Sequence, residues 1–134
     1  MQDNILIYGN IAKVRIPYEN EIKEVYAHVI DYNGRLFTQH GNVNIDPNKI
    51  TYTFSDFETG LKIRSVEFFA FELEDMSTKA KATRHIVETF EKYIKPIIDK
   101  HIDKLDELKS GHKVLNDQIV FENGELQKLL DECN

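Results

Sequence analysis

Residues 77–109 read STKAKATRHIVETFEKYIKPIIDKHIDKLDELK, a single amphipathic pattern that follows a strand-like amino-terminal half. Apolar side chains recur there at steps of three and four residues, which is the period of a helix with one buried stripe. The stripe consists of Ile86, Phe90, Tyr93, Ile94, Ile97, Ile98, Ile102, Leu105 and Leu108. The pattern predicts a long helix that packs on a sheet.

The predicted helix has recognisable ends and one irregular position. Ser77 or Thr78 suits its start, because a hydroxyl accepts from the free N–H groups of the first turn, and Gly111 suits its end. Pro96 lies inside the pattern and lacks an N–H, so we expect a kink or a break there. A straight helix would span about 50 Å, roughly twice the width of the sheet beneath it. Either the helix breaks into two helices, over 77–95 and 96–109, that both pack on the sheet, or it is a single bent helix whose far end contacts another chain.

The first 75 residues alternate in polarity and are rich in β-branched and aromatic side chains, which indicates strands. The predicted strands span residues 5–8, 11–16, 22–32, 35–45, 50–54 and 61–73. Their connections are short, whereas parallel strands need crossovers of about a dozen residues or more. We therefore predict an antiparallel meander of about five to six strands.

Turn residues fix several details of this sheet. Asn33-Gly34 predicts a two-residue hairpin, since both turn positions need a positive φ, and it sets Tyr32 opposite Arg35. Pro17 is expected to end the second strand, because it has no N–H to donate. The strand at 50–54 is expected to have one buried and one solvated face.

The fold class that follows is α+β in a single domain over residues 1–134. Residues 1–75 form the antiparallel sheet, and the long, proline-kinked helix of residues 77–109 covers it. Residues 112–134 form a tail in which 118–121 predicts a short strand and 124–132 a short terminal helix.

Charge and composition exclude several functional classes. The net charge is −6, and neither half of the chain has the basic excess that binding to a phosphate backbone needs. No apolar stretch is long enough to span a membrane. Cys133 is a lone cysteine, and the amino terminus lacks the features of a signal peptide, so we expect a cytoplasmic protein.

No motif of catalysis or of cofactor binding is found, so we expect a protein that is not an enzyme and has no cofactor. His85-x-x-Glu88 places two potential ligands on one helix face, but it has no second copy, and no metal site is predicted. His28 and His40 fall on opposite faces of the sheet in the predicted register, which argues against joint catalysis.

Two sets of residues are candidates for binding. Lys13 and Arg15 alternate on one predicted strand and Lys62 and Arg64 on another, so neighbouring strands would gather four cations into an anion pocket. The second set is the far part of the helix stripe, where apolar side chains extend beyond the sheet and predict an interface between chains. It consists of Ile98, Ile102, Leu105 and Leu108.

The favoured function is that of a small non-enzymatic interaction protein, a homo-oligomeric inhibitor or adaptor that binds another protein. The composition, rich in lysine, isoleucine, asparagine and aspartate, is similar to that of bacterial or phage accessory proteins. The alternative is an oligomeric ligand-binding module that sequesters an anionic small molecule such as a nucleotide. An enzyme with an unrecognised site is the third hypothesis, and a carboxylate or histidine with a perturbed pKa in a cleft would favour it.

Overall fold

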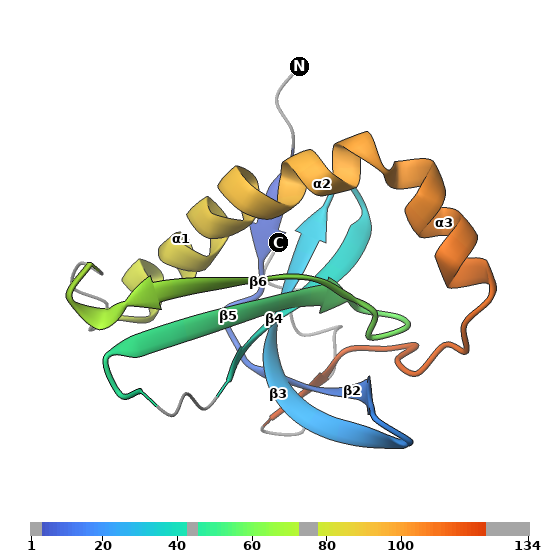
Figure 1. Ribbon diagram of the computed structural model, residues 1–134, viewed down its shortest axis with the longest axis horizontal. Coiled ribbons are helices and arrows are strands. Elements are labelled where there is room, and N and C mark those ends of the chain that lie inside the picture. The colour runs from blue at the N-terminus through green and yellow to red at the C-terminus, as the bar shows by residue number, and fades with distance from the viewer. Residues whose placement is uncertain (1–3, 43–45, 73–77, 123–134) are drawn as a thin grey trace.

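A seven-stranded antiparallel sheet with a long helix across it makes up the computed structural model, which describes residues 4–42, 46–72 and 78–122 (Figure 1). The strands are β1 (Ile5–Ile7), β2 (Ala12–Tyr18), β3 (Glu21–Tyr32), β4 (Arg35–Asn42), β5 (Lys49–Asp56), β6 (Lys62–Phe69) and β7 (Val120–Phe121). The helical segments are the 3₁₀ turn η1 (Ala70–Glu72), α1 (Lys79–Thr89), the π-helical turn η2 (Phe90–Ile94), α2 (Lys95–Lys100) and α3 (Ile102–Ser110). The predicted α+β class, with an antiparallel sheet under a helix, is confirmed.

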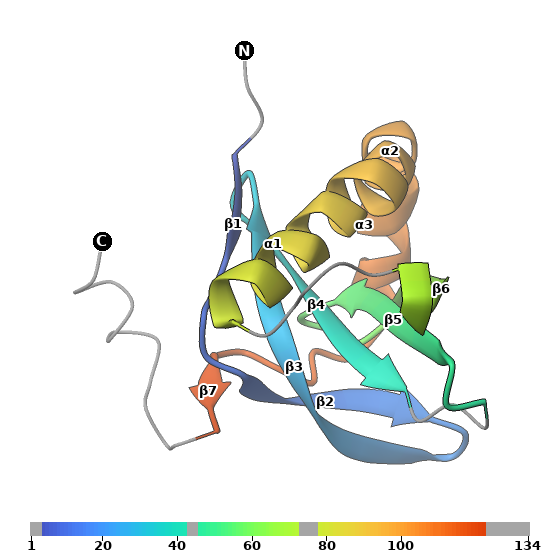
Figure 2. The same ribbon diagram turned by 90° about the vertical axis from the view of Figure 1, so that its left-hand side faces the viewer.

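The long strand β3 pairs with different strands along its length and so belongs to two parts of the sheet. The strand order is β6-β5-β4-β3-β2-β7, and β1 also pairs with β3. Residues 21–27 of β3 pair with β2, whereas residues 28–32 pair with β4. The β2–β3 hairpin therefore leaves the main sheet and crosses beneath β4 and β5 (Figure 2). As a result, both faces of the central strands are covered.

The hairpin predicted at Asn33-Gly34 is confirmed. Asn33 and Gly34 have φ values of 52° and 90°, and Tyr32 lies opposite Arg35. The Gly34 N–H donates to the Asp31 side chain over 2.8 Å, which fixes the turn further.

The observed strands differ from the predicted ranges by a few residues, and the ends at Pro17 and Phe69 have a physical reason. Pro17 does not end β2 but pairs with Ile22. Among the described strands, β7 reaches only Ala12 and Lys13 of β2, so at Pro17 the strand is an edge, where a missing N–H is tolerated. The strand predicted over 61–73 ends at Phe69, because η1 follows and the Glu72 carboxylate accepts from the Phe69 N–H over 3.1 Å.

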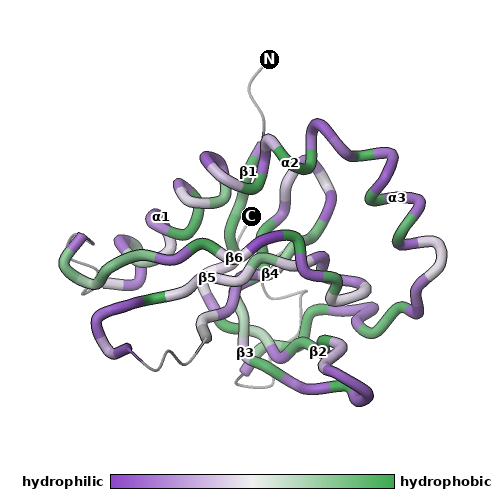
Figure 3. Tube along the Cα trace, in the orientation of Figure 1, coloured by the Kyte–Doolittle hydropathy of each residue, from purple (hydrophilic) through white to green (hydrophobic). Residues whose placement is uncertain are grey.

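The helix face of the sheet carries an aromatic core. Strand residues Ile30, Tyr32, Phe37, Tyr52, Phe54 and Val66 pack there against Ile86, Phe90, Ile94 and Ile98 of the helix. The Phe90 ring lies 5.7 Å from the rings of both Tyr32 and Phe37, measured between centroids. Burying each such side chain contributes roughly 1.5–3 kcal/mol, which explains why the stripe, more than intrinsic propensity, holds the helix. Figure 3 shows the hydrophobic residues of the helix on the side toward the sheet.

The opposite face is enclosed as well, which corrects the expectation of a solvated face on β5. Thr53 and Ser55 are only 6% and 2% exposed. The β2–β3 hairpin, Phe57 and the carboxyl-terminal segment cover this face with a second apolar cluster, which consists of Ala12, Val14, Ala27, Val29, Phe57, Ile119 and Phe121. The alternation of side chains along β5 therefore predicts correctly which face is polar, but it does not predict that this polar face is buried.

The helix begins at the predicted cap, since the Thr78 hydroxyl accepts from the Lys81 N–H over 3.2 Å. It does not break at Pro96, and the predicted kink there is not confirmed. Instead, η2 widens the turn just before the proline, with the Lys95 N–H bonded to the Phe90 carbonyl. Such π-helical turns accommodate a residue that cannot complete the regular ladder.

The single helix predicted over 77–109 is wrong beyond Lys100, because the chain breaks at His101 (φ −121°, ψ 28°) and α3 turns away from α2. This turn lets Ile102 and Leu105 pack against the aromatic core instead of projecting past the sheet. α3 ends at Gly111, as predicted.

Ion pairs tie α3 to the strands. Lys109 Nζ lies 3.2 Å from Asp56 Oδ1 and 2.8 Å from Glu58 Oε1, and the Asp56 side chain is 2% exposed. Burial lowers the pKa of Lys109, but the bonds to Glu58 and Asp56 outweigh it and raise the pKa overall. Arg35 adds two bonds to the Asp106 carboxylate, of 2.6 and 3.0 Å.

Asn116 holds the carboxyl-terminal segment on the sheet. Its Oδ1 accepts from the Arg15 N–H over 2.8 Å, and its Nδ2 donates to the carbonyls of Arg15 and Phe57 over 2.9 and 2.8 Å. One amide therefore joins the edge of β2 to the turn after β5. Further along, β7 confirms part of the strand predicted at 118–121, whereas the helix predicted at 124–132 lies outside the described residues.

Candidate binding surfaces

The four cations predicted to share a pocket lie at two distant places. β2 carries Lys13 and Arg15, β6 carries Lys62 and Arg64, and three strands separate β2 from β6. The premise that the two strands are neighbours is therefore wrong. The predicted meander already implies this separation, because only consecutive strands are neighbours in a meander.

Lys13 and Arg15 line a hollow of about 170 Å³ beside the carboxyl-terminal segment. Glu24 and Asp117 line the same hollow, and Glu24 lies opposite Arg15 in the β2–β3 pairing. Two carboxylates thus balance the two cations, which removes the net attraction for an anion. Binding of an anionic ligand at these residues stays a prediction.

Lys62 and Arg64 lie in different surroundings although they share a strand. The Arg64 guanidinium lies over the Tyr93 ring, 5.4 Å from its centroid, which is a cation–π geometry. Lys62 lines a concavity of about 210 Å³ between the start of β6 and the α2–α3 corner, here named the β6–α3 groove.

The β6–α3 groove is apolar with a basic rim. Its apolar wall is formed by Ile63, Ile97, Ile98, Leu105 and Leu108. Its polar lining consists of Lys62, His101 and Lys104, so these lining residues include no acidic side chain. The groove therefore offers apolar contact together with positive charge.

The four predicted interface residues differ in the exposure of their side chains. Ile98 is 3% exposed and belongs to the core of its own chain, so the small surface that it contributes lies within the groove. Ile102 and Leu105 are partly buried against the same core. Leu108 is 45% exposed and borders the groove. A contact with another protein through Leu105 and Leu108 stays a prediction.

The histidines of the predicted candidates are engaged in packing. His85 Nδ1 lies 2.8 Å from the Tyr52 hydroxyl, and burial lowers the pKa of His85 against a raising effect of Glu88. Gln39, not His40, pairs with His28, so the two histidines point to opposite faces, as the register predicts. In residues 4–42, 46–72 and 78–122 no three histidine, cysteine, aspartate or glutamate side chains gather as metal ligands would.

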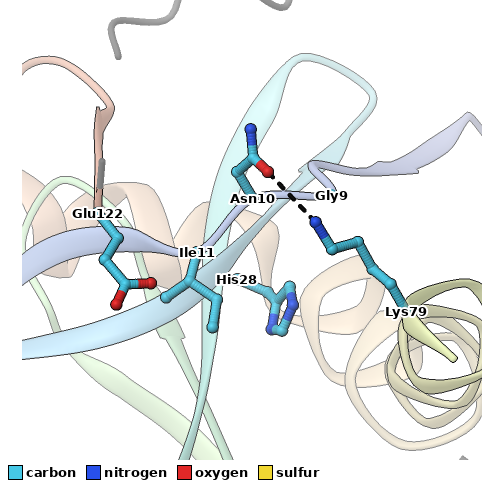
Figure 4. Close-up of a pocket in the computed structure, with 6 residues that line it drawn as sticks. All are labelled: Gly9, Asn10, Ile11, His28, Lys79 and Glu122. Atoms are coloured by element: carbon cyan, nitrogen blue, oxygen red, sulfur yellow. Dashed lines mark hydrogen bonds between the residues drawn. The ribbon is translucent and has the colours of Figure 1, made fainter. Parts of the chain in front are cut away.

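One pocket had no signal in the sequence, because its residues come from four separate places in the chain. It has a volume of about 320 Å³ and is here named the Lys79–Glu122 pocket. Its lining consists of Gly9, Asn10, Ile11, His28, Lys79 and Glu122 (Figure 4).

Comparison of the chain with protein-family models, with curated proteins and with solved structures gives no match. Within the described ranges, no helix is both long and apolar enough to cross a membrane. The surfaces described above are therefore the basis for a function.

Proposed function

We propose that the chain is a cytoplasmic, non-enzymatic interaction protein, of the inhibitor or adaptor kind found among bacterial and phage accessory proteins. In this proposal it binds another protein by seating a segment of that partner in the β6–α3 groove. The segment carries apolar side chains flanked by carboxylates. The observation that carries the proposal is the apolar groove with a basic rim on a chain of net charge −6.

The size of the groove supports a side-chain anchor over a free small molecule. Small-molecule sites usually have volumes of about 300–1,000 Å³. At about 210 Å³ the groove is smaller and suits one or two apolar side chains of a partner. Such anchors in fitted pockets contribute most of the free energy of binding in many interfaces.

The charge of the groove supports an acidic partner segment. Lys62 and Lys104 flank the apolar wall, and exposed Leu108 continues it onto the surface. Complementary charge at the rim speeds association and disfavours basic competitors, whereas the apolar anchors provide affinity.

The free side of β6 supports an extended conformation of the bound segment. β6 ends the sheet order and pairs on one side only among the described strands. The Phe69 N–H bonds to Glu72 and not to β5, so alternate residues such as Ser65 and Glu67 direct their main-chain groups outward. Addition of a strand to such an edge is a common mode of peptide recognition.

A matched pair of synthetic peptides tests this function. One peptide carries two leucines flanked by glutamates, and the other carries the same leucines flanked by lysines. We expect the glutamate peptide to bind at least tenfold more tightly by fluorescence anisotropy, which corresponds to about 1.4 kcal/mol. Leu108→Asp and Lys104→Glu should each remove that binding, whereas Leu6→Asp, at an exposed leucine of β1, should not. Equal binding of both peptides, or an unaffected Leu108→Asp variant, contradicts the proposal.

Self-association through the same groove is the second part of the proposal. Its support is the apolar surface at Leu105 and Leu108 beside the free edge of β6. Light scattering after size exclusion tests it with the wild type and Leu108→Asp. A wild-type dimer that becomes monomeric in the variant assigns the groove to a second copy of the chain. A wild-type monomer at high micromolar concentration rules out the oligomer.

A further inference from the structure

The Lys79–Glu122 pocket has the size of a small-molecule site. Its volume of about 320 Å³ reaches the range of roughly 300–1,000 Å³ in which such ligands bind. It lies away from the β6–α3 groove and shares no lining residue with it. A ligand here would therefore be independent of the proposed protein partner.

Two hydrogen bonds position the charged residues of this pocket. Lys79 is the first residue of α1, and its Nζ donates to Asn10 Oδ1 over 3.3 Å. Glu122 follows β7, and its N–H donates to the Ile11 carbonyl over 2.8 Å. Both contacts are made to the link between β1 and β2, one by a side chain and one by the main chain, so this link brings the two charged residues to the same pocket.

The charges in the pocket are one positive and one negative. His28 adds no charge at neutral pH, because burial lowers its pKa and the nearby Lys79 lowers it further, against a bond to Gln39 that raises it. A polyanion such as a nucleotide would meet one cation and be repelled by Glu122. A simple cation would likewise be repelled by Lys79.

Figure 4 shows how the lining is arranged. Lys79 and Glu122 enter from opposite sides, and Ile11 and the His28 ring lie between them. The charged ends are therefore separated by a partly apolar floor. A ligand that contacts both charges therefore has to extend across Ile11 and the His28 ring.

We propose that this pocket binds an elongated small zwitterion, with its carboxylate at Lys79 and its ammonium group at Glu122. The connecting chain lies over Ile11, and the neutral imidazole of His28, which is bonded to Gln39, has its second ring nitrogen left for a polar group between the ends. The chemical class is that of ω-amino acids and of short peptides with free termini.

The test uses the full chain and three matched probes: 6-aminohexanoate, hexanoate and hexylamine. Titrations followed by NMR should show binding of 6-aminohexanoate, with each one-charge probe at least tenfold weaker, since a charge-assisted hydrogen bond is lost. Triglycine, which has free termini, should compete with 6-aminohexanoate for the same shifted signals.

Two variants test which charged group of the ligand each charged residue of the pocket binds. Glu122→Gln should weaken 6-aminohexanoate at least tenfold and leave hexanoate unchanged. Lys79→Met should weaken both 6-aminohexanoate and hexanoate and leave hexylamine unchanged. Lys100→Met and Asp103→Asn, at exposed positions outside the pocket, match the charge changes and should have no effect.

The proposal is overturned by any of three results. The first is the absence of binding of both 6-aminohexanoate and triglycine up to about 10 mM. The second is equal affinity for hexanoate and 6-aminohexanoate. The third is an unchanged affinity in Glu122→Gln and Lys79→Met, provided that their NMR spectra show the wild-type fold.

Discussion

The two faces of the sheet are covered in different ways. On the helix face, large aromatic and aliphatic side chains from strands and helix interlock around Phe90. On the opposite face, a smaller cluster of alanine, valine and isoleucine residues with two phenylalanines covers buried polar side chains of the central strands, which are Thr38, His40, Thr53 and Ser55. The first face depends on packing area, whereas the second also depends on hydrogen bonds that must be satisfied out of water.

The nature of each cover explains this difference. A helix presents a regular apolar stripe, so large side chains can fill the space beneath it. The carboxyl-terminal segment is irregular apart from the short β7, and the Asn116 side chain adds three hydrogen bonds to its few main-chain contacts with the sheet. Substitutions on the two faces should therefore differ in size and even in sign.

The largest effect is expected at the centre of the helix face. Phe90→Ala should lower the free energy of unfolding by about 3–5 kcal/mol, because it leaves a cavity among three aromatic rings. Chemical denaturation measures the loss, and Phe90→Leu gives a smaller loss if the alanine variant does not fold. Phe71→Ala, at a side chain that is 84% exposed, should change stability by less than about 0.5 kcal/mol. Similar losses for Phe90→Ala and Phe71→Ala would contradict the description of this core.

The next largest loss of stability is expected at the hydrogen bonds that hold the carboxyl-terminal segment on the opposite face. Asn116→Ala should cost about 1–3 kcal/mol, because it leaves partly buried main-chain groups of Arg15 and Phe57 without their partner. Hydrogen exchange should show that residues 112–121 lose protection while the helix keeps it. Gln118→Ala, at an exposed residue of the same segment, is the control and should be neutral. Loss of protection in the helix as well would mean that the two faces are not separable.

The contrast between the two faces of the sheet also explains which features of the fold the sequence predicts. The helix, its Thr78 cap and the Asn33-Gly34 register were predictable, because each depends on residues close together in the chain. The enclosed second face was not, because Thr53 and Ser55 are polar and their cover combines the β2–β3 hairpin, Phe57 and the carboxyl-terminal segment, which are separate in the chain. The Lys79–Glu122 pocket was out of reach for the same reason.

Two expectations failed, one through local helix geometry and one through strand order. Pro96 has the right chemistry for a break, but η2 absorbs the missing bond, and the chain turns at His101 instead. The four cations alternate as predicted, but the strand order places Lys13 and Lys62 on strands that are not neighbours. Residue pattern gives the face of a strand, whereas its neighbours depend on the path of the whole chain.

A change of opposite sign is expected at Thr38. In the part of the chain that the structure describes, its buried Oγ1 has no hydrogen-bond partner. Thr38→Val removes this unsatisfied group at nearly constant volume and should stabilise the fold by about 1 kcal/mol. Thr53→Val is the matched variant: its hydroxyl bonds to that of Ser65 over 3.0 Å, so it should destabilise by a similar amount. Thermal or chemical unfolding measures the stability change in both variants. A change of the same sign in both would refute the assignment of Thr38 Oγ1 as an unsatisfied group.

A smaller effect is expected from pH on the helix face. Burial is the main cause that lowers the pKa of both His28 and His85 below the ordinary value of 6.5. The unfolded chain therefore binds more protons just below pH 6.5, and stability should fall as the pH falls through that value and then level off. His85→Gln should reduce this loss in denaturation curves at pH 7.5, 6 and 5, whereas exposed His101→Gln should leave it unchanged. A wild-type stability that rises on acidification in this range would show that the histidines are not buried as described.

The smallest effect is expected at Arg15, where main chain and side chain have separate roles. The main-chain N–H and carbonyl of Arg15 bond to Asn116, whereas its side chain is exposed on the outer side of the hairpin. Arg15→Ala keeps both main-chain bonds, so the free energy of unfolding should change by less than about 0.5 kcal/mol. Denaturation of Arg15→Ala beside Asn116→Ala compares the two partners of one contact.

The same variant tests the remaining anion prediction. If Arg15 binds an anionic ligand, Arg15→Ala should weaken inorganic phosphate or a nucleotide by about ten- to a hundredfold while stability stays constant. Arg64→Ala on β6 serves as the comparison, because its guanidinium lies over Tyr93 and far along the strand order from Arg15. Since Glu24 and Asp117 balance the charge beside Arg15, we expect the wild type to bind these anions weakly at most. A loss of stability above 1 kcal/mol in Arg15→Ala would instead place its side chain in the fastening of the second face, alongside Asn116.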